Sequence, residues 1–233
     1  MKSLFDYQKV FGNWMECPEF VRLINSGYFK LLIKFVKDNY KENECFPVNT
    51  SDIFNVFKTS SYKDIKVVIL GDKPYYNVES NGYAFASNNQ YTCKIGCQNV
   101  RNSIENYKKN VEFEFDFSLK KWTNQKVLLL NRSLTISKVK ENNHIHAWNK
   151  FNAAIINIII DNNPGVIFAL WGKEQSEFLL KAIPDRKLIH CYTLECNNPK
   201  SKYLFKKDWS NDCFNKINAI IEENNGIEEI IKW

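Results

Sequence analysis

The chain has 233 residues, of which 44% are hydrophobic and 15% aromatic, and its formal net charge is +6. This composition excludes an intrinsically disordered protein and supplies enough apolar side chains for one large domain with a substantial core. The mildly basic balance is compatible with a polyanionic partner, although many proteins without such a partner carry a similar charge.

Seven cysteines are present, and no long apolar run lies between Met1 and Asn13. These features predict reduced thiols in an intracellular protein of the nucleus or cytoplasm, or of the host cytoplasm if the source is viral. The close cysteine pairs lack the two-residue gap typical of zinc sites, so we expect no metal and no cofactor. The longest apolar run, Ile155 to Ile160, is too short to span a bilayer.

Apolar periodicity divides a single domain, residues 1–233, into a helical lead-in over 1–63 and an α/β core over 64–233. Helices are expected at Glu19–Ile24, Tyr28–Tyr40, Gln98–Lys109, Trp148–Ile160, Glu174–Ala182 and Phe214–Glu223. Strands are expected at Asp64–Leu70, Val127–Leu130, Val166–Leu170 and Lys187–His190. Because strands alternate with helices, we predict a three-layer α/β/α fold with a central four-stranded parallel sheet.

A polar turn follows the first expected strand. The apolar run ends at Leu70 and continues as Gly71-Asp72-Lys73-Pro74-Tyr75, in which glycine and proline stop the strand. Asn131 and His190 stand at the ends of two other expected strands. Since the carboxyl ends of parallel strands meet at one edge of a sheet, where such folds bind ligands, we expect a site at this edge.

Several segments resemble motifs of uracil-DNA glycosylases, in the order found in that family. Gly71-Asp72-Lys73-Pro74-Tyr75 resembles the start of its G-Q-D-P-Y-H motif, and Gly82–Ser87 resembles its G-L-A-F-S stretch. Val127–Thr135 is similar to its L-L-L-N-x-x-L-T strand, and Val166–Gly172 to its third strand. His190 and Leu194 match two positions of its H-P-S-P-L-S loop. The resemblance covers nearly the whole chain and implies the fold of that family.

The resemblance also implies a pocket that receives a uracil flipped out of DNA. It assigns Phe85 to stacking on the base, Asn131 to reading the base edge, and Tyr75 to excluding the methyl group of thymine. Gly71 is counted among the substrate-binding residues. Phe85 is also compatible with a place in the core, although its motif context favours stacking, and Asn131 is compatible with a turn or helix cap.

Three further roles follow from the resemblance. His190 is expected to donate a hydrogen bond to the departing uracil, although a histidine at a strand end can also be purely structural. His144, with Trp148, resembles the S-H…W segment of the family, shortened by one residue as in its poxvirus branch, and is expected near the DNA. Leu194 is expected either to wedge into the base stack or to be an ordinary loop or core leucine.

Lys73 stands where the family carries its catalytic aspartate. The sugar becomes cation-like in the transition state. A lysine about 4 Å away would cost about 4 kcal/mol at an effective dielectric near 20, where a carboxylate would give a similar gain. Three alternatives stay open: Asp72 takes over the role, Lys73 is neutral through burial, or Lys73 attacks the sugar and forms a Schiff base.

Two functions are therefore considered. The first is a uracil-DNA glycosylase of base excision repair that hydrolyses the N-glycosidic bond, weakened by Lys73. The second is a catalytically inactive DNA-binding or replication-accessory module, favoured because Gly96–Asn99 replaces the family's P-P-P-S loop and because Glu195 would repel phosphates. The expected partners are uracil-containing DNA, single- or double-stranded, and a replication or processivity protein, with no membrane. A nucleotide binder is disfavoured because no glycine-rich phosphate loop follows the first strand.

Overall fold

The computed structural model of the chain describes residues 7–76, 80–89, 91, 95–108, 114–139, 141–199 and 212–233. Its helices are α1 (Tyr7–Phe11), η1 (Gly12–Glu16), α2 (Pro18–Asn25), α3 (Gly27–Glu42), η2 (Thr50–Asp52), α4 (Asn55–Lys58), α5 (Ile95–Lys108), α6 (Lys120–Thr123), α7 (Glu141–Asn162), α8 (Lys173–Ala182), α9 (Asp185–Leu188), α10 (Cys213–Asn225) and η4 (Ile227–Glu229). Its strands are β1 (Cys45–Phe46), β2 (Val67–Gly71), β3 (Val127–Asn131), β4 (Ile136–Ser137), β5 (Val166–Trp171) and β6 (Cys191–Cys196). The expected helices are all present; residues 1–6 of the lead-in and Lys109, the expected end of one helix, lie outside the described residues.

The central sheet has four parallel strands in the order β3-β2-β5-β6. Strands β2, β3 and β5 bury every residue, because helices cover both faces of the sheet and α4 and α6 also contact β3, which stands at one edge. This burial explains why the three strands are continuous apolar runs in the sequence. The prediction of a four-stranded parallel sheet within a three-layer fold is confirmed. The sequence did not indicate the small antiparallel pair of β1 and β4.

The fourth strand differs from its prediction. The strand β6 spans Cys191–Cys196, and the residues before it form the short helix α9. Pro184 precedes this helix and Asp185 lies in its first turn, and both are favourable at a helix start. Within β6 only Cys196 is fully buried, so this edge strand lacks the apolar run that marks the inner strands. The prediction of a strand at Lys187–His190 is therefore wrong.

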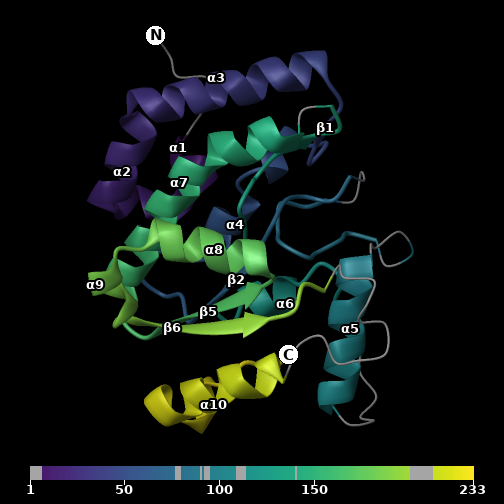
Figure 1. The fold of residues 1–233 in the computed structure, drawn as a ribbon, viewed down its shortest axis with the longest axis vertical. Coiled ribbons are helices and arrows are strands. Elements are labelled where there is room, and N and C mark those ends of the chain that lie inside the picture. The colour runs from purple at the N-terminus through teal and green to yellow at the C-terminus, as the bar shows by residue number, and fades with distance from the viewer. Residues whose placement is uncertain are drawn as a thin grey trace.

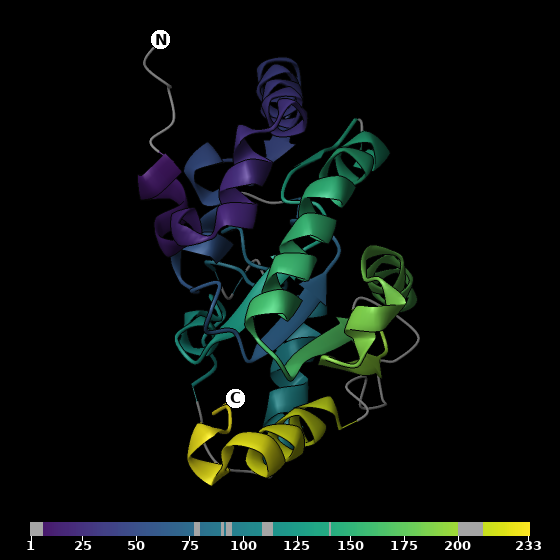
Figure 2. The same ribbon diagram turned by 90° about the vertical axis from the view of Figure 1, so that its left-hand side faces the viewer.

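Helices cover both faces of the sheet (Figures 1 and 2). Helices α7 and α8 lie on one side of the sheet, whereas α10 lies on the other side, close to the C-terminus. The N-terminal helices α2 and α3 contact α7, so the helical lead-in extends the first of these layers. Helix α8 also contacts β5, and α10 contacts β6.

Aromatic side chains join the helical lead-in to the sheet. The ring of Phe11 lies 5.0 Å from that of Phe20, and the ring of Trp14 lies 5.1 Å from that of Phe57. The Nε1 atom of Trp14 donates a hydrogen bond of 2.7 Å to the carbonyl oxygen of Ser60. These buried rings belong to the same cluster as the residues of β2, β3 and β5. One core thus extends from the N-terminal helices to the sheet.

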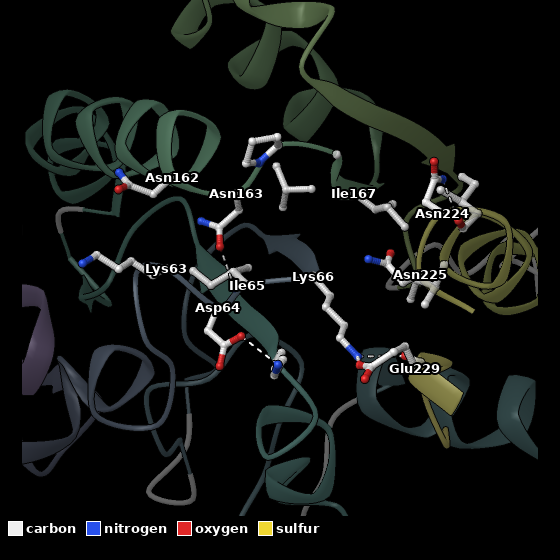
Figure 3. A pocket seen from close by; sticks show the side chains of 16 residues that line it. Lys63, Asp64, Ile65, Lys66, Asn162, Asn163, Ile167, Asn224, Asn225 and Glu229 are labelled. Atoms are coloured by element: carbon white, nitrogen blue, oxygen red, sulfur yellow. Dashed lines mark hydrogen bonds and ion pairs between the residues drawn. The ribbon is translucent and has the colours of Figure 1, made fainter. Parts of the chain in front are cut away.

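A pocket of about 480 Å³ lies at the amino ends of β2 and β5, away from the strand ends that the sequence singles out (Figure 3). Lys66 forms an ion pair with Glu229 of η4, and Asp64 forms one of 2.7 Å with Lys126. The first pair connects the sheet to the C-terminal segment, the second connects the residues just before β2 and β3, and both neutralise charge around the pocket. We interpret the pocket as a packing gap between the amino ends of the strands and the C-terminal helices, with a structural role.

Asn163 holds the backbone together on one side of this pocket. Its Oδ1 accepts a hydrogen bond of 2.8 Å from the backbone N–H of Ile65. Its Nδ2 donates bonds of 2.8 Å to the carbonyl oxygens of Tyr62 and Ile159. The side chain therefore satisfies three backbone groups from two segments that are distant in sequence. Figure 3 shows Asn163 directed toward Ile65.

Asn163→Ala is expected to lower the free energy of unfolding by about 2 to 4 kcal/mol, because buried backbone groups lose their partners. Chemical denaturation monitored by circular dichroism measures this loss. The matched control is Asn162→Ala, which removes one hydrogen bond to the carbonyl oxygen of Ile158. The control is expected to cost about 1 kcal/mol or less. Equal losses in the two variants would contradict the structural role of Asn163.

Candidate active site

The carboxyl ends of the strands lie along one edge of the sheet. Strand β2 ends at Gly71 and β3 at Asn131, and these two residues are partners in register. Strand β5 ends at Trp171 and β6 at Cys196, which are also partners. In Figure 1 the arrow of β6 points to the right, toward α5. The loops that follow the strands therefore begin side by side, as the sequence predicted for this type of sheet.

Gly71, Phe85 and Asn131 are in close contact at this edge. A Cβ atom on Gly71 would lie 2.5 Å from Asn131 Oδ1 and 3.3 Å from Phe85 Cε2, so a larger residue would collide with the carboxamide. An aromatic ring and a carboxamide thus lie against the same backbone position. Such a pair suits the recognition of a planar base, because one partner stacks and the other both donates and accepts hydrogen bonds.

Phe85 is held in an unusual backbone conformation. Its φ angle is +63°, in the left-handed region that bulky residues rarely adopt. The residue is only 6% exposed, and its ring lies 4.8 Å from that of Trp171 at the end of β5. Packing therefore fixes a conformation that costs about 1 to 3 kcal/mol, and such outliers cluster at functional sites. Phe85 is part of the core as well, so the two expectations for it are compatible.

Helix α7 supports the end of β3. The Nδ2 atom of Asn152 donates hydrogen bonds of 3.1 Å to the carbonyl oxygen of Asn131 and 2.6 Å to that of Arg132. The backbone N–H of Arg132 in turn donates a bond of 3.0 Å to the carbonyl oxygen of Gly71. These bonds fix the backbone at the position where the sequence predicts the base-reading carboxamide.

Tyr75 connects the loop after β2 to helix α5. The residue is 8% exposed and packs with Cys97 of α5 and with Phe115 and Phe117. The Gly96–Asn99 segment, expected as a replacement for a loop, is the first turn of α5. Tyr75 is thus a buried wall near the strand ends, and its role in excluding thymine stays a prediction.

Three charged side chains meet at the ends of β2 and β3. The Nζ atom of Lys73 lies 3.7 Å from Asp72 Oδ2, and the Nη1 atom of Arg132 lies 3.8 Å from Asp72 Oδ1. Arg132 also donates a bond of 3.2 Å to the carbonyl oxygen of Glu174. The side chains of Lys73 and Asp72 are 20% and 25% exposed. Two cations thus share one partly exposed carboxylate, which leaves an excess of positive charge beside the Gly71 backbone.

His190 and Leu194 are not at this edge. His190 is exposed and lies before β6, where its carbonyl oxygen accepts a bond of 2.8 Å from the backbone N–H of Gly165, at the amino end of β5. Leu194 lies within β6, pairs in register with Ala169 and packs against the core. Of the two expectations for Leu194, the ordinary core leucine is the one that the structure gives.

His144 is completely buried and has no contact with the molecular surface. Its Nδ1 lies 2.8 Å from Thr135 Oγ1, which also accepts a hydrogen bond of 2.8 Å from Trp148 Nε1. The ring of Phe35 packs at 5.1 Å. The expectation that His144 contacts DNA is therefore wrong, because the histidine anchors α7 to the segment after β3. His146, on the same helix, is exposed.

Burial lowers the pKa of His144 from 6.5 to about 4. Between pH 6.5 and 4 the His144 side chain is protonated in the unfolded chain but neutral in the folded chain. The free energy of unfolding is therefore highest above pH 6.5 and falls as the pH drops toward 4. We expect a loss of about 2 to 3 kcal/mol over this range, measured by denaturant titration. His144→Gln should remove this component, whereas His146→Gln should keep it. The reverse pattern would contradict this interpretation.

Asn198 is the site residue that the sequence reasoning missed. It follows β6 at the carboxyl edge, and its Nδ2 lies 3.2 Å from the place of a Cβ atom on Gly172, just beyond β5. The next residue, Pro199, accepts a bond of 2.6 Å at its carbonyl oxygen from Asn99 of α5. Asn198 therefore lies at the same carboxyl edge of the sheet as Gly71 and Asn131.

Metal binding and membrane insertion find no support in the parts of the chain that the structure describes. No group of three histidine, cysteine, aspartate or glutamate side chains gathers there as a metal site. None of the described helices has the length and apolar character needed to cross a bilayer. The six cysteines in these parts are free thiols.

The fold and this edge define a parallel α/β protein whose strand ends bring an aromatic ring and a carboxamide together. Residues 57–222 match the sequence model of the uracil DNA glycosylase superfamily. A uracil-DNA glycosylase of Christiangramia forsetii is 31% identical over 209 residues, covering 88% of this chain and 91% of the relative. One of Borrelia hermsii is 36% identical over 170 residues, covering 70% and 74%. The chain belongs to the uracil-DNA glycosylase superfamily.

Solved structures show the same fold. The crystal structure of mimivirus uracil-DNA glycosylase superposes with a TM-score of 0.76 at 20% identity, covering 94% of this chain and 89% of that one. A variant of the mimivirus protein in complex with UGI gives a TM-score of 0.79 at 18% identity, covering 95% and 89%. The similarity of these chains extends to the helical lead-in, because nearly all of this chain is covered.

Proposed function

We propose that this chain removes uracil from DNA by hydrolysing the N-glycosidic bond, as the first step of base excision repair. The contact of Phe85 and Asn131 with the backbone of Gly71 carries this proposal. Membership of the superfamily supports the same reaction. The hydrolase is preferred to an inactive module because the base-binding residues are together at the strand ends, where an accessory protein would have no need of them.

The uracil must leave the base stack before it can enter such a pocket. The ring of Phe85 then offers a stacking face. The carboxamide of Asn131 accepts a hydrogen bond from the N3–H group of uracil and donates one to its O4. Tyr75, buried nearby, restricts the space for a methyl group. Together these groups distinguish uracil from cytosine by hydrogen bonding and from thymine by size.

The bond-breaking step needs negative charge near the sugar and a hydrogen-bond donor near the leaving base. Asp72 supplies the only carboxylate among the three charged side chains beside Gly71, and Lys73 and Arg132 hold it from both sides. We assign the donor role to the amide of Asn198, which follows β6 and lies beside Gly172 at the carboxyl edge. The positive charge of Lys73 and Arg132 near the sugar predicts slower uracil release than in a site with a catalytic aspartate. The neutral amide of Asn198 predicts slower release than a site with a histidine donor.

Uracil-containing DNA is the proposed substrate, in single- or double-stranded form. A net charge of +6 supports binding to a phosphate backbone, and such binding weakens with salt. A compartment that holds DNA is proposed with it, the nucleus or cytoplasm, and a replication or processivity protein as partner stays a prediction of the family resemblance.

The test is release of uracil from a single-stranded oligonucleotide with one uracil, compared with oligonucleotides that carry thymine or cytosine at that position. Slow release of uracil alone is expected. Salt-dependent binding of the uracil oligonucleotide without any release under single-turnover conditions would contradict the hydrolase and would favour the inactive module.

A further inference from the structure

Lys73 brings a primary amine next to a carboxylate at the proposed sugar position. The Nζ atom lies 3.7 Å from Asp72 Oδ2, and the side chain is 20% exposed, so the amine is at the rim of the site. Lys73 follows two residues after Gly71, whose backbone contacts Phe85 and Asn131. Lys73 is thus two residues from the backbone position at which the proposed function places the base.

We propose that Lys73 is a nucleophile toward abasic DNA, so that this chain also acts as a β-elimination lyase. The substrate class is an abasic deoxyribose in its open-chain aldehyde form, the product of uracil removal. The inference rests on the proposed function only for the position of the sugar, because abasic DNA can be supplied without any uracil release. Lysine amines form Schiff bases with carbonyl substrates in many enzymes.

The chemistry balances with water as the only co-reactant. The neutral amine attacks C1′ of the aldehyde, and the resulting hydroxyl group takes up one proton from solvent and leaves as water, which gives a protonated imine joined to Nζ. Removal of a proton from C2′ lets that electron pair form the C2′–C3′ double bond, and the bond from C3′ to its phosphate oxygen breaks. Water then hydrolyses the conjugated imine, which restores the lysine and leaves an unsaturated aldehyde on one DNA end and a phosphate on the other.

The neighbours of Lys73 fit this sequence. The carboxylate of Asp72 can take the proton from the lysine ammonium group and, after passing it to solvent, can take the proton from C2′. Its 25% exposure gives the contact with solvent that this exchange needs. Arg132, 3.8 Å from the other oxygen of the carboxylate, keeps Asp72 oriented and adds positive charge where the phosphate departs.

The test is reductive trapping on abasic DNA prepared by acid depurination of a single guanine. Sodium borohydride converts an imine into a stable amine and so links the protein covalently to a labelled oligonucleotide. The proteins compared are the wild type, Lys73→Arg and Lys63→Arg. Arginine keeps the charge and the ion pair with Asp72 but forms no stable imine. Lys63 lines the pocket at the opposite edge of the sheet and serves as the matched lysine control.

A covalent complex is expected for the wild type and Lys63→Arg, with loss of more than nine-tenths of it in Lys73→Arg at unchanged affinity for abasic DNA. Strand cleavage should fall in parallel. A wild type that binds abasic DNA but is never trapped would overturn the inference, as would trapping that persists in Lys73→Arg. Because the substrate contains no uracil, a failure here is separate from a failure of uracil hydrolysis.

Discussion

Lys73→Asp is expected to raise the rate of uracil release about 100-fold. At about 4 Å and an effective dielectric near 20, the change replaces a repulsion of about 4 kcal/mol by an attraction of similar size. Partial exposure of the side chain and the nearby Arg132 screen this difference to about 3 kcal/mol. Single-turnover kinetics on a single-stranded uracil oligonucleotide measure the rate.

Two companion variants define what causes the increase. Lys73→Gln removes the cation without adding a carboxylate and is expected to give an intermediate rate. Lys63→Asp makes the same charge change at the opposite edge of the sheet and should leave the rate unaltered. If Lys73→Asp binds uracil-containing DNA but releases uracil no faster than the wild type, a carboxylate at this position does not reach the sugar.

The same variant also separates the two proposed activities. Lys73→Asp has no amine and should lose imine trapping while it gains hydrolysis. The two readouts thus move in opposite directions on one substitution, which a general effect on folding or DNA affinity cannot produce. Lys73 therefore slows uracil hydrolysis and, by the same amine, allows a reaction with the abasic product.

Strands β2 and β3 could be predicted from sequence because burial on both faces constrains every residue, even though β3 stands at one edge of the sheet. Val67 to Leu70 and Val127 to Leu130 have no polar member, and the structure buries all of them. The residues directly after these runs are then fixed at the carboxyl edge by the parallel topology. This is why the proximity of Gly71 and Asn131 followed from sequence alone.

The other end of the sheet could not be predicted by the same reasoning. Strand β6 is an edge strand with exposed Tyr192, Thr193 and Glu195, so its composition does not distinguish it from a loop. The apolar pair Leu188-Ile189 predicts a strand that ends at His190. In the structure His190 precedes β6 and therefore lies at the amino edge of the sheet. Buried polar groups such as His144 were equally hidden, because a motif match does not indicate whether a side chain points inward.

Asn131→Leu is expected to reduce uracil release about 100- to 1000-fold. Leucine has a similar volume, so the packing against Phe85 and Gly71 is largely kept, while the group that donates to O4 and accepts from N3–H is lost. The N3–H and O4 groups of a uracil in the pocket would then lose their hydrogen bonds to water and gain none from the protein. This cost of desolvation makes the expected effect large. Single-turnover release at saturating enzyme measures it.

Abasic DNA provides the control for Asn131→Leu, because it has no base for the carboxamide to read. The variant should bind abasic DNA as the wild type does and lose affinity only for uracil-containing DNA. An equal loss for both ligands would mean that Asn131 supports the loop after β3 and does not contact the base. In that case the hydrogen bonds from Asn152 to the backbone of Asn131 and Arg132 would be the reason why this residue matters.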